Sequence, residues 1–334
     1  MKHIVLHGAK HHIENNFLFL SNQKIDSISQ IKGISNLTKL QGLHLNNNSI
    51  AKISGLDNLT NLRVLDLSAN NIKHISNLEN LENLRELSLS GNNIRKIEEL
   101  DNLINLEKLN LSSNSIKRIE GLKSLINLKR LFFTNNKIKK IKDLNNLSNL
   151  QWLALNGNRI NEIEGLDDLT NLKDLNLNNN FISKIEGLEN LSSLHRLSIR
   201  ESNINELQGL NSLSNLEFAF FGWNQITKIQ GLDTLHKLRV LSLSRNNISK
   251  IEGLERQENL EELYLNENNI FKIENLDALQ RLEFIDLSGN QITELECINK
   301  LPNLREILLR RNYLYRSTIK EVKDSNSQLN IEIS

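Results

Sequence analysis

The sequence predicts an α/β solenoid: a right-handed superhelix with a parallel β-sheet on its concave face and 3₁₀ or extended turns on its convex face. Two observations support this fold class. One residue type recurs every 22 residues without insertion or deletion, and the same apolar frame surrounds each recurrence. A fixed period of this length is typical of chains that fold by stacking one structural repeat on the next.

The recurring residue is asparagine at twelve positions and serine at one. The positions are Asn48, Asn70, Asn92, Asn114, Asn136, Asn158, Asn180, Ser202, Asn224, Asn246, Asn268, Asn290 and Asn312. An asparagine amide can both donate to and accept from turn backbone that stacking has removed from water. Serine offers only a hydroxyl group, so we expect the repeat that contains Ser202 to be the weakest of the series.

The apolar frame assigns each part of a repeat to a local structure. An alternating pair such as Leu175 and Leu177 is typical of a short strand, because alternate strand residues point to opposite faces. Further along, Ile182, Ile185 and Leu188 recur at every third residue, which favours extended or 3₁₀-like turns over an α-helix. One repeat cannot bury this frame alone, so we expect stacking between neighbours to supply the stability.

A second backbone signal precedes the leucine that ends each turn. Glycine, asparagine or aspartate fills this position in most repeats, and these residues tolerate a positive φ angle. They are Gly55, Asn77, Gly121, Asp143, Gly165, Gly187, Gly209, Gly231, Gly253 and Asn275. Glu99 and Cys297 depart from the pattern, and we expect a strained or different turn at these two positions.

The two ends of the chain deviate from the regular repeat. We predict an N-terminal cap and an irregular first repeat over residues 1–35, thirteen 22-residue repeats over 36–315, and a C-terminal cap over 316–334. The first range contains a candidate capping strand at residues 3–6. In the last range we expect a short helix over residues 317–324, followed by a strand that carries Leu329, Ile331 and Ile333.

Composition limits the classes of function. The formal net charge is +1 with 24% charged residues, so the chain as a whole has no bias towards polyanions. The single cysteine excludes an internal disulfide, and we find no signal-peptide core or membrane-spanning run. We therefore expect a monomer in the cytoplasm, or in the nucleus of a eukaryote, that does not bind membranes.

The phrases Lys184-Ile185-Glu186-Gly187-Leu188 and Lys250-Ile251-Glu252-Gly253-Leu254 resemble the SDS-type subfamily of 22-residue leucine-rich repeats. Its best-known member is a regulatory subunit of protein phosphatase 1. The resemblance implies a binding protein that holds its partner on the concave face through aromatic and acidic side chains. Bacterial surface adhesins use a similar unit but usually carry proline where this chain has glycine.

Repeat nine departs from the polar filling of the inner face. The inner positions are those equivalent to Asp174, Asn176, Asn178 and Asn179, and in this repeat Phe218, Phe220 and Trp223 occupy three of them. We expect the neighbours of these rings on the sheet to be Arg196, Arg200, Glu201, Arg245 and Tyr264. A second, smaller aromatic set consists of Phe132 and Trp152 beside Arg130.

Two interpretations of the aromatic residues remain open. They could anchor a partner, because large rings surrounded by charges are typical of interaction hot spots. They could instead pack on one another and repair irregular repeats. We favour binding, because a monomer gains little from exposing three rings together. The predicted partner-binding residues are Phe218, Phe220, Trp223, Tyr264, Arg196, Arg200, Glu201, Arg245, Asp286, Glu306, Phe132 and Trp152.

The resemblance implies aromatic or acidic inner positions, and Phe220, Asp286 and Glu306 match it in type. Ala154, Asn176, Ser198 and Leu308 do not. Catalytic and phosphate-binding motifs are absent from the sequence, and we expect no cofactor, no metal and no catalytic residue. Inner-face charges are balanced, which disfavours nucleic acid. The sequence therefore predicts a non-catalytic protein-binding scaffold. The alternatives are a regulatory subunit of a type 1 phosphatase and a secreted or surface adhesin.

Overall fold

The computed structural model describes residues 3–295, 298–315 and 329–333. The chain divides into two compact units, residues 1–160 and 161–334, and each is described here by itself. In both units short parallel strands alternate with turns, which confirms the predicted solenoid. Within the described residues the helical segments are three 3₁₀ helices, η1 (Ile28–Gln30), η2 (Ile34–Asn36) and η3 (Ile298–Lys300), so the α component of the predicted class is minimal.

The first unit begins with a β-hairpin and continues as a parallel sheet. Strand β1 pairs antiparallel with β2, β2 pairs antiparallel with β3, and β3 to β9 are parallel neighbours in sequence order. The strands are β1 (His3–Leu6), β2 (Ala9–Glu14), β3 (Phe17–Phe19), β4 (Gly42–His44), β5 (Val64–Asp66), β6 (Glu86–Ser88), β7 (Lys108–Asn110), β8 (Arg130–Phe132) and β9 (Trp152–Ala154).

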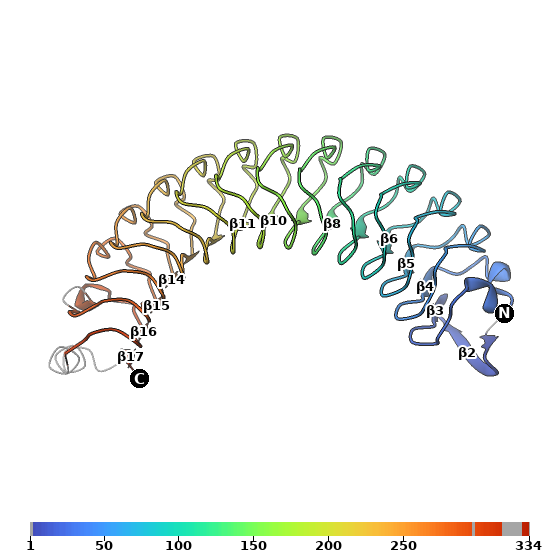
Figure 1. The fold of residues 1–334 in the computed structure, drawn as a ribbon, viewed down its shortest axis with the longest axis horizontal. Coiled ribbons are helices and arrows are strands. Elements are labelled where there is room, and N and C mark those ends of the chain that lie inside the picture. The colour runs from blue at the N-terminus through green and yellow to red at the C-terminus, as the bar shows by residue number, and fades with distance from the viewer. Residues whose placement is uncertain (1–2, 296–297, 316–328, 334) are drawn as a thin grey trace. The chain divides into compact units, whose positions relative to one another are not determined.

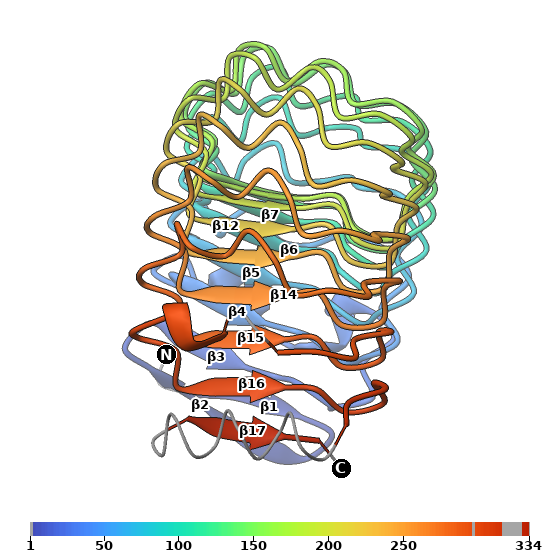
Figure 2. The ribbon, with the colours of Figure 1, turned by 90° about the vertical axis from the view of Figure 1, so that its left-hand side faces the viewer.

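The second unit is a parallel sheet throughout. Its strands are β10 (Asp174–Asn176), β11 (Arg196–Ser198), β12 (Phe218–Phe220), β13 (Val240–Ser242), β14 (Glu262–Tyr264), β15 (Phe284–Asp286), β16 (Glu306–Leu308) and β17 (Asn330–Glu332). Each strand pairs with the next in the same direction, as Figure 2 shows for β14 to β17. The predicted final strand is thus present as β17, whereas the expected helix over 317–324 lies outside the described residues.

The core follows from the alternation within each three-residue strand. Leu175, Leu197 and Ala219 are fully buried and lie in register on neighbouring strands, while the residues on either side of them point to the opposite face. In Figure 1 the strands of each unit lie along the inner side of that unit, and the turns lie along its outer side. The inner positions identified from the sequence therefore form straight columns across each sheet.

The recurring asparagine holds the turns of adjacent repeats together. Asn114 accepts a hydrogen bond from the Ile94 amide at 2.9 Å and donates to the carbonyl groups of Leu89 and Leu111 at 2.9 and 3.1 Å. The same bonds recur in most repeats. Ser202 lacks them, and its buried hydroxyl oxygen has no hydrogen-bond partner among the described residues. The predicted difference at this position is therefore present in the structure.

The turns contain two left-handed positions per repeat, of which the sequence indicated one. The position before the turn-ending leucine has positive φ wherever glycine, asparagine or aspartate was noted, and Glu99 adopts the same conformation with φ 56°. Of the two expectations for Glu99, the strained alternative is the one present, because a glutamate at positive φ is unfavourable and the turn itself is unchanged. Cys297 lies outside the described residues. The residue before the recurring asparagine is also left-handed, and in repeat nine this residue is Trp223, with φ 58°.

Candidate functional site

The aromatic residues of β12 lie on the inner face of the second unit and contact an arginine on the neighbouring strand. Phe218 and Phe220 flank the buried Ala219 and lie in register with Arg196 and Ser198 of β11. The Arg196 guanidinium carbon is 4.6 Å from the centroid of the Phe218 ring and 5.3 Å from that of Phe220. A cation at this distance is attracted to the face of an aromatic ring.

Arg196 is held from its other side by Asp174 of β10. Its Nε lies 3.5 Å from Asp174 Oδ2, and the aspartate side chain is only 14% exposed. Burial raises the pKa of the Asp174 carboxyl group, and the positive charge of Arg196 acts in the opposite direction. The aspartate, the arginine and the two rings therefore form one contiguous cluster on the inner face.

Trp223 lies in the turn after β12 and is held by a second arginine. The Arg245 guanidinium carbon is 3.8 Å from the centroid of the Trp223 ring, and the same guanidinium donates to Glu267 Oε1 at 2.7 Å. Trp223 remains 45% exposed. Its positive φ is a property of the repeat, because the residue before the recurring asparagine is left-handed in the other repeats as well.

The rings of repeat nine do not pack on one another. Among the described residues, no ring-to-ring contact joins Phe218, Phe220 and Trp223, and each ring faces an arginine instead. Phe220 lies in register between two small inner-face residues, Ser198 and Ser242, which are both 8% exposed. This arrangement does not fit the interpretation that the three rings repair irregular repeats by packing together.

Tyr264 extends the aromatic surface along β14. Its ring is tilted against that of Phe284, with centroids 5.2 Å apart, and its hydroxyl group donates to Glu262 Oε2 at 2.7 Å. Burial and then the bond to Glu262 raise the pKa of Tyr264 to about 12. Phe284 was not among the residues predicted from the sequence, although it occupies the same inner position as Phe218 in the repeat frame.

The other predicted residues of this unit surround the rings in different ways. Arg200 and Glu201 are exposed, and neither has an ion-pair partner among the described residues. Asp286 accepts from the Ser288 amide at 2.9 Å, and Glu306 accepts from Asn330 at 2.8 Å. Asp286 and Glu306 lie in different columns, because Asp286 is in register with Leu308.

The predicted residues of the first unit form a smaller set. Trp152 of β9 is 45% exposed and lies in register with Arg130, while Phe132 is in register with Ala154. Near the hairpin, the rings of Phe19 and His44 stack with centroids 4.7 Å apart. This pair was not predicted, because a single histidine in a sequence does not indicate a stacked ring on the preceding repeat.

The inner face presents aromatic rings and charged side chains. Some of the charged side chains pair between neighbouring repeats, as do Glu86 with Lys108 at 3.3 Å and Asp174 with Arg196 at 3.5 Å. The described residues contain no group of three or more histidine, cysteine, aspartate or glutamate side chains that could hold a metal ion. Within them, too, no helix is long and apolar enough to cross a membrane.

Comparisons with known proteins identify the repeat. The family model described as Leucine Rich repeats (2 copies) matches residues 38–82, 60–103, 104–146, 148–190, 236–280 and 258–296, which together make up more than half of the chain. No curated protein matches the chain.

Solved structures of similar fold include bacterial proteins. An internalin from Listeria monocytogenes is 29% identical with a TM-score of 0.75, and the match covers 98% of this chain and 90% of the internalin. A leucine-rich-repeat protein from Leptospira interrogans is 25% identical with a TM-score of 0.77, and 95% of each chain is covered. A chain of the LRIM1/APL1C complex shares the fold at 20% identity and a TM-score of 0.72, over 88% of this chain and 60% of that one.

Proposed function

Because this chain belongs to the leucine-rich-repeat family, we propose that it is a non-catalytic scaffold that binds a protein partner on its inner face. Phe218, Phe220 and Trp223 are the proposed anchors. Tyr264 supports them, and the charged residues around them are Arg196, Arg200, Glu201 and Arg245. Asp286 and Glu306 would receive basic groups of the partner, and Phe132 and Trp152 form a secondary contact on the first unit.

The observation that carries this proposal is the pairing of rings with arginines in place of ring-to-ring packing. Trp223 is 45% exposed in a left-handed conformation, and Arg245 is held across its face by Glu267. Aromatic and arginine side chains dominate the energetics of protein interfaces. Ordered arginines also lose less side-chain entropy when a partner binds, which favours affinity.

A quantitative pull-down from a lysate of the source organism tests the proposal. The bait is the wild-type chain or the double variant Phe220→Ala/Trp223→Ala, and a thermal melt verifies the fold of each. Loss of two anchors is expected to weaken partner capture by about 2–4 kcal/mol, or at least thirtyfold in affinity. Proteins that the variant no longer captures are the candidate partners.

The matched control is Phe132→Ala/Trp152→Ala, which removes the same two ring types from the first unit. We expect this variant to retain the partners with a smaller loss. An unchanged partner list for Phe220→Ala/Trp223→Ala would contradict the proposal, and equal losses for both variants would move the anchor away from repeat nine.

A surface adhesin is the second candidate, and the similarity to an internalin favours it. The first candidate goes with a cytosolic location, which we propose from the single cysteine. Fractionation of source cells separates the two, because an adhesin is exposed to protease added outside intact cells. The finer proposal of a type 1 phosphatase regulator rests on the resemblance of the repeat phrases. A stoichiometric complex with purified phosphatase catalytic subunit is the result that would support it.

A further inference from the structure

A groove on the turn side of the first unit is lined entirely by lysine and arginine. It has a volume of about 630 Å³ and lies between the turns that follow Asn114, Asn136 and Asn158. Its lining includes Lys117, Arg118, Lys137, Lys139, Lys140 and Lys142, together with Arg159. This basic groove is outside the inner face, and neither the aromatic residues nor the paired charges discussed above belong to it.

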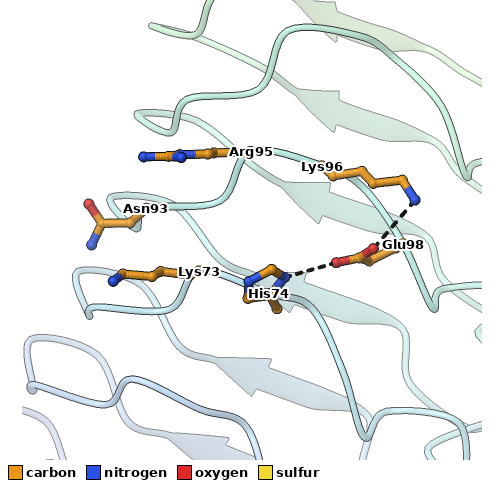
Figure 3. A pocket seen from close by; sticks show the side chains of 6 residues that line it. All are labelled: Lys73, His74, Asn93, Arg95, Lys96 and Glu98. Atoms are coloured by element: carbon orange, nitrogen blue, oxygen red, sulfur yellow. Dashed lines mark hydrogen bonds and ion pairs between the residues drawn. The ribbon is translucent and has the colours of Figure 1, made fainter.

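The same groove occurs two repeats earlier with different side chains, which makes it an internal reference. The reference groove of about 340 Å³ is lined by Lys73, His74, Asn93, Arg95, Lys96 and Glu98. Figure 3 shows that Glu98 lies between His74 and Lys96, at 3.3 and 3.5 Å. At the repeat positions of Asn93 and Glu98, the basic groove carries Lys137 and Lys142, so a carboxylate is replaced by a cation.

Most cations of the basic groove are not paired with a carboxylate among the described residues. Among the described residues, the side chains of Lys117, Arg118, Lys137, Lys139, Lys142 and Arg159 form no ion pair. Like charges on adjacent repeats repel one another, even in water. Such an arrangement does not stabilise the fold, and this points to a ligand that supplies the missing negative charge.

The backbone fixes where these cations lie. Ile116 and Ile119 are fully buried on either side of Lys117 and Arg118, and the Lys137 amide donates to the Ile116 carbonyl at 2.8 Å. The Ile116 amide in turn donates to Asn136 Oδ1 at 3.0 Å. The exposed side chains therefore project from turns whose backbone is held by the recurring asparagines, so the spacing of their attachment points is fixed before a ligand binds.

The donor set of the groove selects the chemistry of the ligand. Lysine and arginine side chains donate hydrogen bonds and do not accept them. A peptide would bring amide donors that find no side-chain acceptor in this lining, and nucleobases would find no aromatic ring to stack on. Phosphate oxygens accept hydrogen bonds only, and both lysine and arginine suit them. A closely spaced row of phosphates also matches the charge density better than a chain with widely spaced anionic groups.

We propose that the basic groove binds linear polyphosphate, a chain of phosphate groups without bases or sugars. The net charge of +1 for the whole chain hides this site, because acidic residues elsewhere balance the local excess. The site is independent of the proposed protein-binding face, since all the lining residues lie on the turns of the first unit and none lies on a strand.

The test is a titration of the full chain with fluorescently labelled inorganic polyphosphate, followed by anisotropy at near-physiological ionic strength. Lys142→Glu gives the basic groove the carboxylate of the reference groove and is expected to weaken binding about tenfold. Lys139→Glu/Lys142→Glu is expected to weaken it about a hundredfold. Glu98→Lys makes the reference groove more basic and is expected to strengthen binding a few fold, by about the effect of one added exposed cation.

Lys250→Glu is the matched control, because it makes the same change of charge at an exposed turn position of the second unit. An equal loss for Lys250→Glu and Lys142→Glu would overturn the proposal by showing that total charge alone determines affinity. Failure of wild type to bind polyphosphate would also overturn it. So would equally tight binding of heparin, single-stranded DNA or poly-glutamate, since the ligand class would then be wrong.

Discussion

The turns marked by Asn114 and Ser202 occupy the same place in their repeats but differ in how their backbone is satisfied. Asn114 is 9% exposed and makes hydrogen bonds to four backbone groups, at Ile94, Leu89, Leu111 and Ser112. At Ser202 the hydroxyl oxygen is buried without a partner, and among the described residues the Ile182 amide has no acceptor.

The difference shows which part of the repeat carries stability. Apolar burial is the same at both turns, since Ile94 and Ile182 are each fully buried. The two turns differ in whether their buried backbone groups have hydrogen-bond partners. A buried group without a partner lowers the free energy of unfolding by about 1–3 kcal/mol. One backbone bond beside Ser202 is also longer, with Glu201 N to Gly222 O at 3.1 Å, whereas the equivalent bond from Ser113 N to Thr134 O is 2.7 Å. The aromatic residues of repeat nine therefore follow the least satisfied turn.

The largest effect is expected from Asn114→Ala, which removes the asparagine of a regular turn. The Ile94 amide would lose its acceptor. The carbonyl groups of Leu89 and Leu111 would each lose one of two donors and keep the bonds from Asn92 and Asn136. We expect a loss of about 2–3 kcal/mol in the free energy of unfolding. Urea denaturation measures the total. Hydrogen exchange of the Ile94 amide shows whether the loss arises at this turn. Unchanged protection of that amide would mean that the Asn114 side chain contributes little to the turn.

An intermediate effect is expected from Ser202→Asn, which restores the missing asparagine. The new side chain gives the Ile182 amide an acceptor and removes the orphaned hydroxyl group, so we expect stabilisation by about 1–2 kcal/mol. Hydrogen exchange of the Ile182 amide should slow in proportion, by about five- to thirtyfold. A destabilised variant would show that the turn of repeat eight has adapted to serine and cannot hold the longer side chain.

The smallest effect is expected when the rings and the turn are changed together. In a double-mutant cycle, the stability cost of Phe220→Ala/Trp223→Ala is measured with Ser202 and again with Ser202→Asn. The rings contact Arg196 and Arg245, and Trp223 is bonded to the turn of Ser202 through its backbone carbonyl, which Trp223→Ala retains. We therefore expect the two costs to agree within about 0.5 kcal/mol. A clearly larger cost in the presence of serine would revive the interpretation that the rings repair this part of the solenoid.

Much of the fold could be predicted because the period constrains it directly. With a fixed interval, each strand leucine must face the same leucine of the next repeat, and the observed pairing of Leu175 with Leu197 follows. The left-handed position before the recurring asparagine was missed because its residue types vary too widely, from Gly91 to Trp223. There the local conformation is imposed by the asparagine ladder and not by the residue itself.

The site was less predictable, for physical reasons that differ between its parts. The repeat frame put Arg196 beside the rings of β12, but whether those rings would touch each other or the arginine depends on rotamers that no pattern encodes. The basic groove was missed because charge was summed over the inner face alone. Lys142 stands out only when its repeat position is compared with Glu98, across turns that had no expected function.

The spacing of the asparagine ladder has a consequence for how this chain can change. Every bond of Asn246, to Phe221, Leu243 and Ile226, spans the same sequence distance as the corresponding bond of Asn114. Deletion of a whole repeat of 22 residues would therefore bring equivalent atoms together again. Deletion of one residue within a repeat would instead shift the asparagine bonds out of register at that point. The solenoid thus has a reading frame of its own. A whole repeat is the smallest unit that can be inserted, deleted or exchanged while the hydrogen-bond register between the remaining repeats is kept.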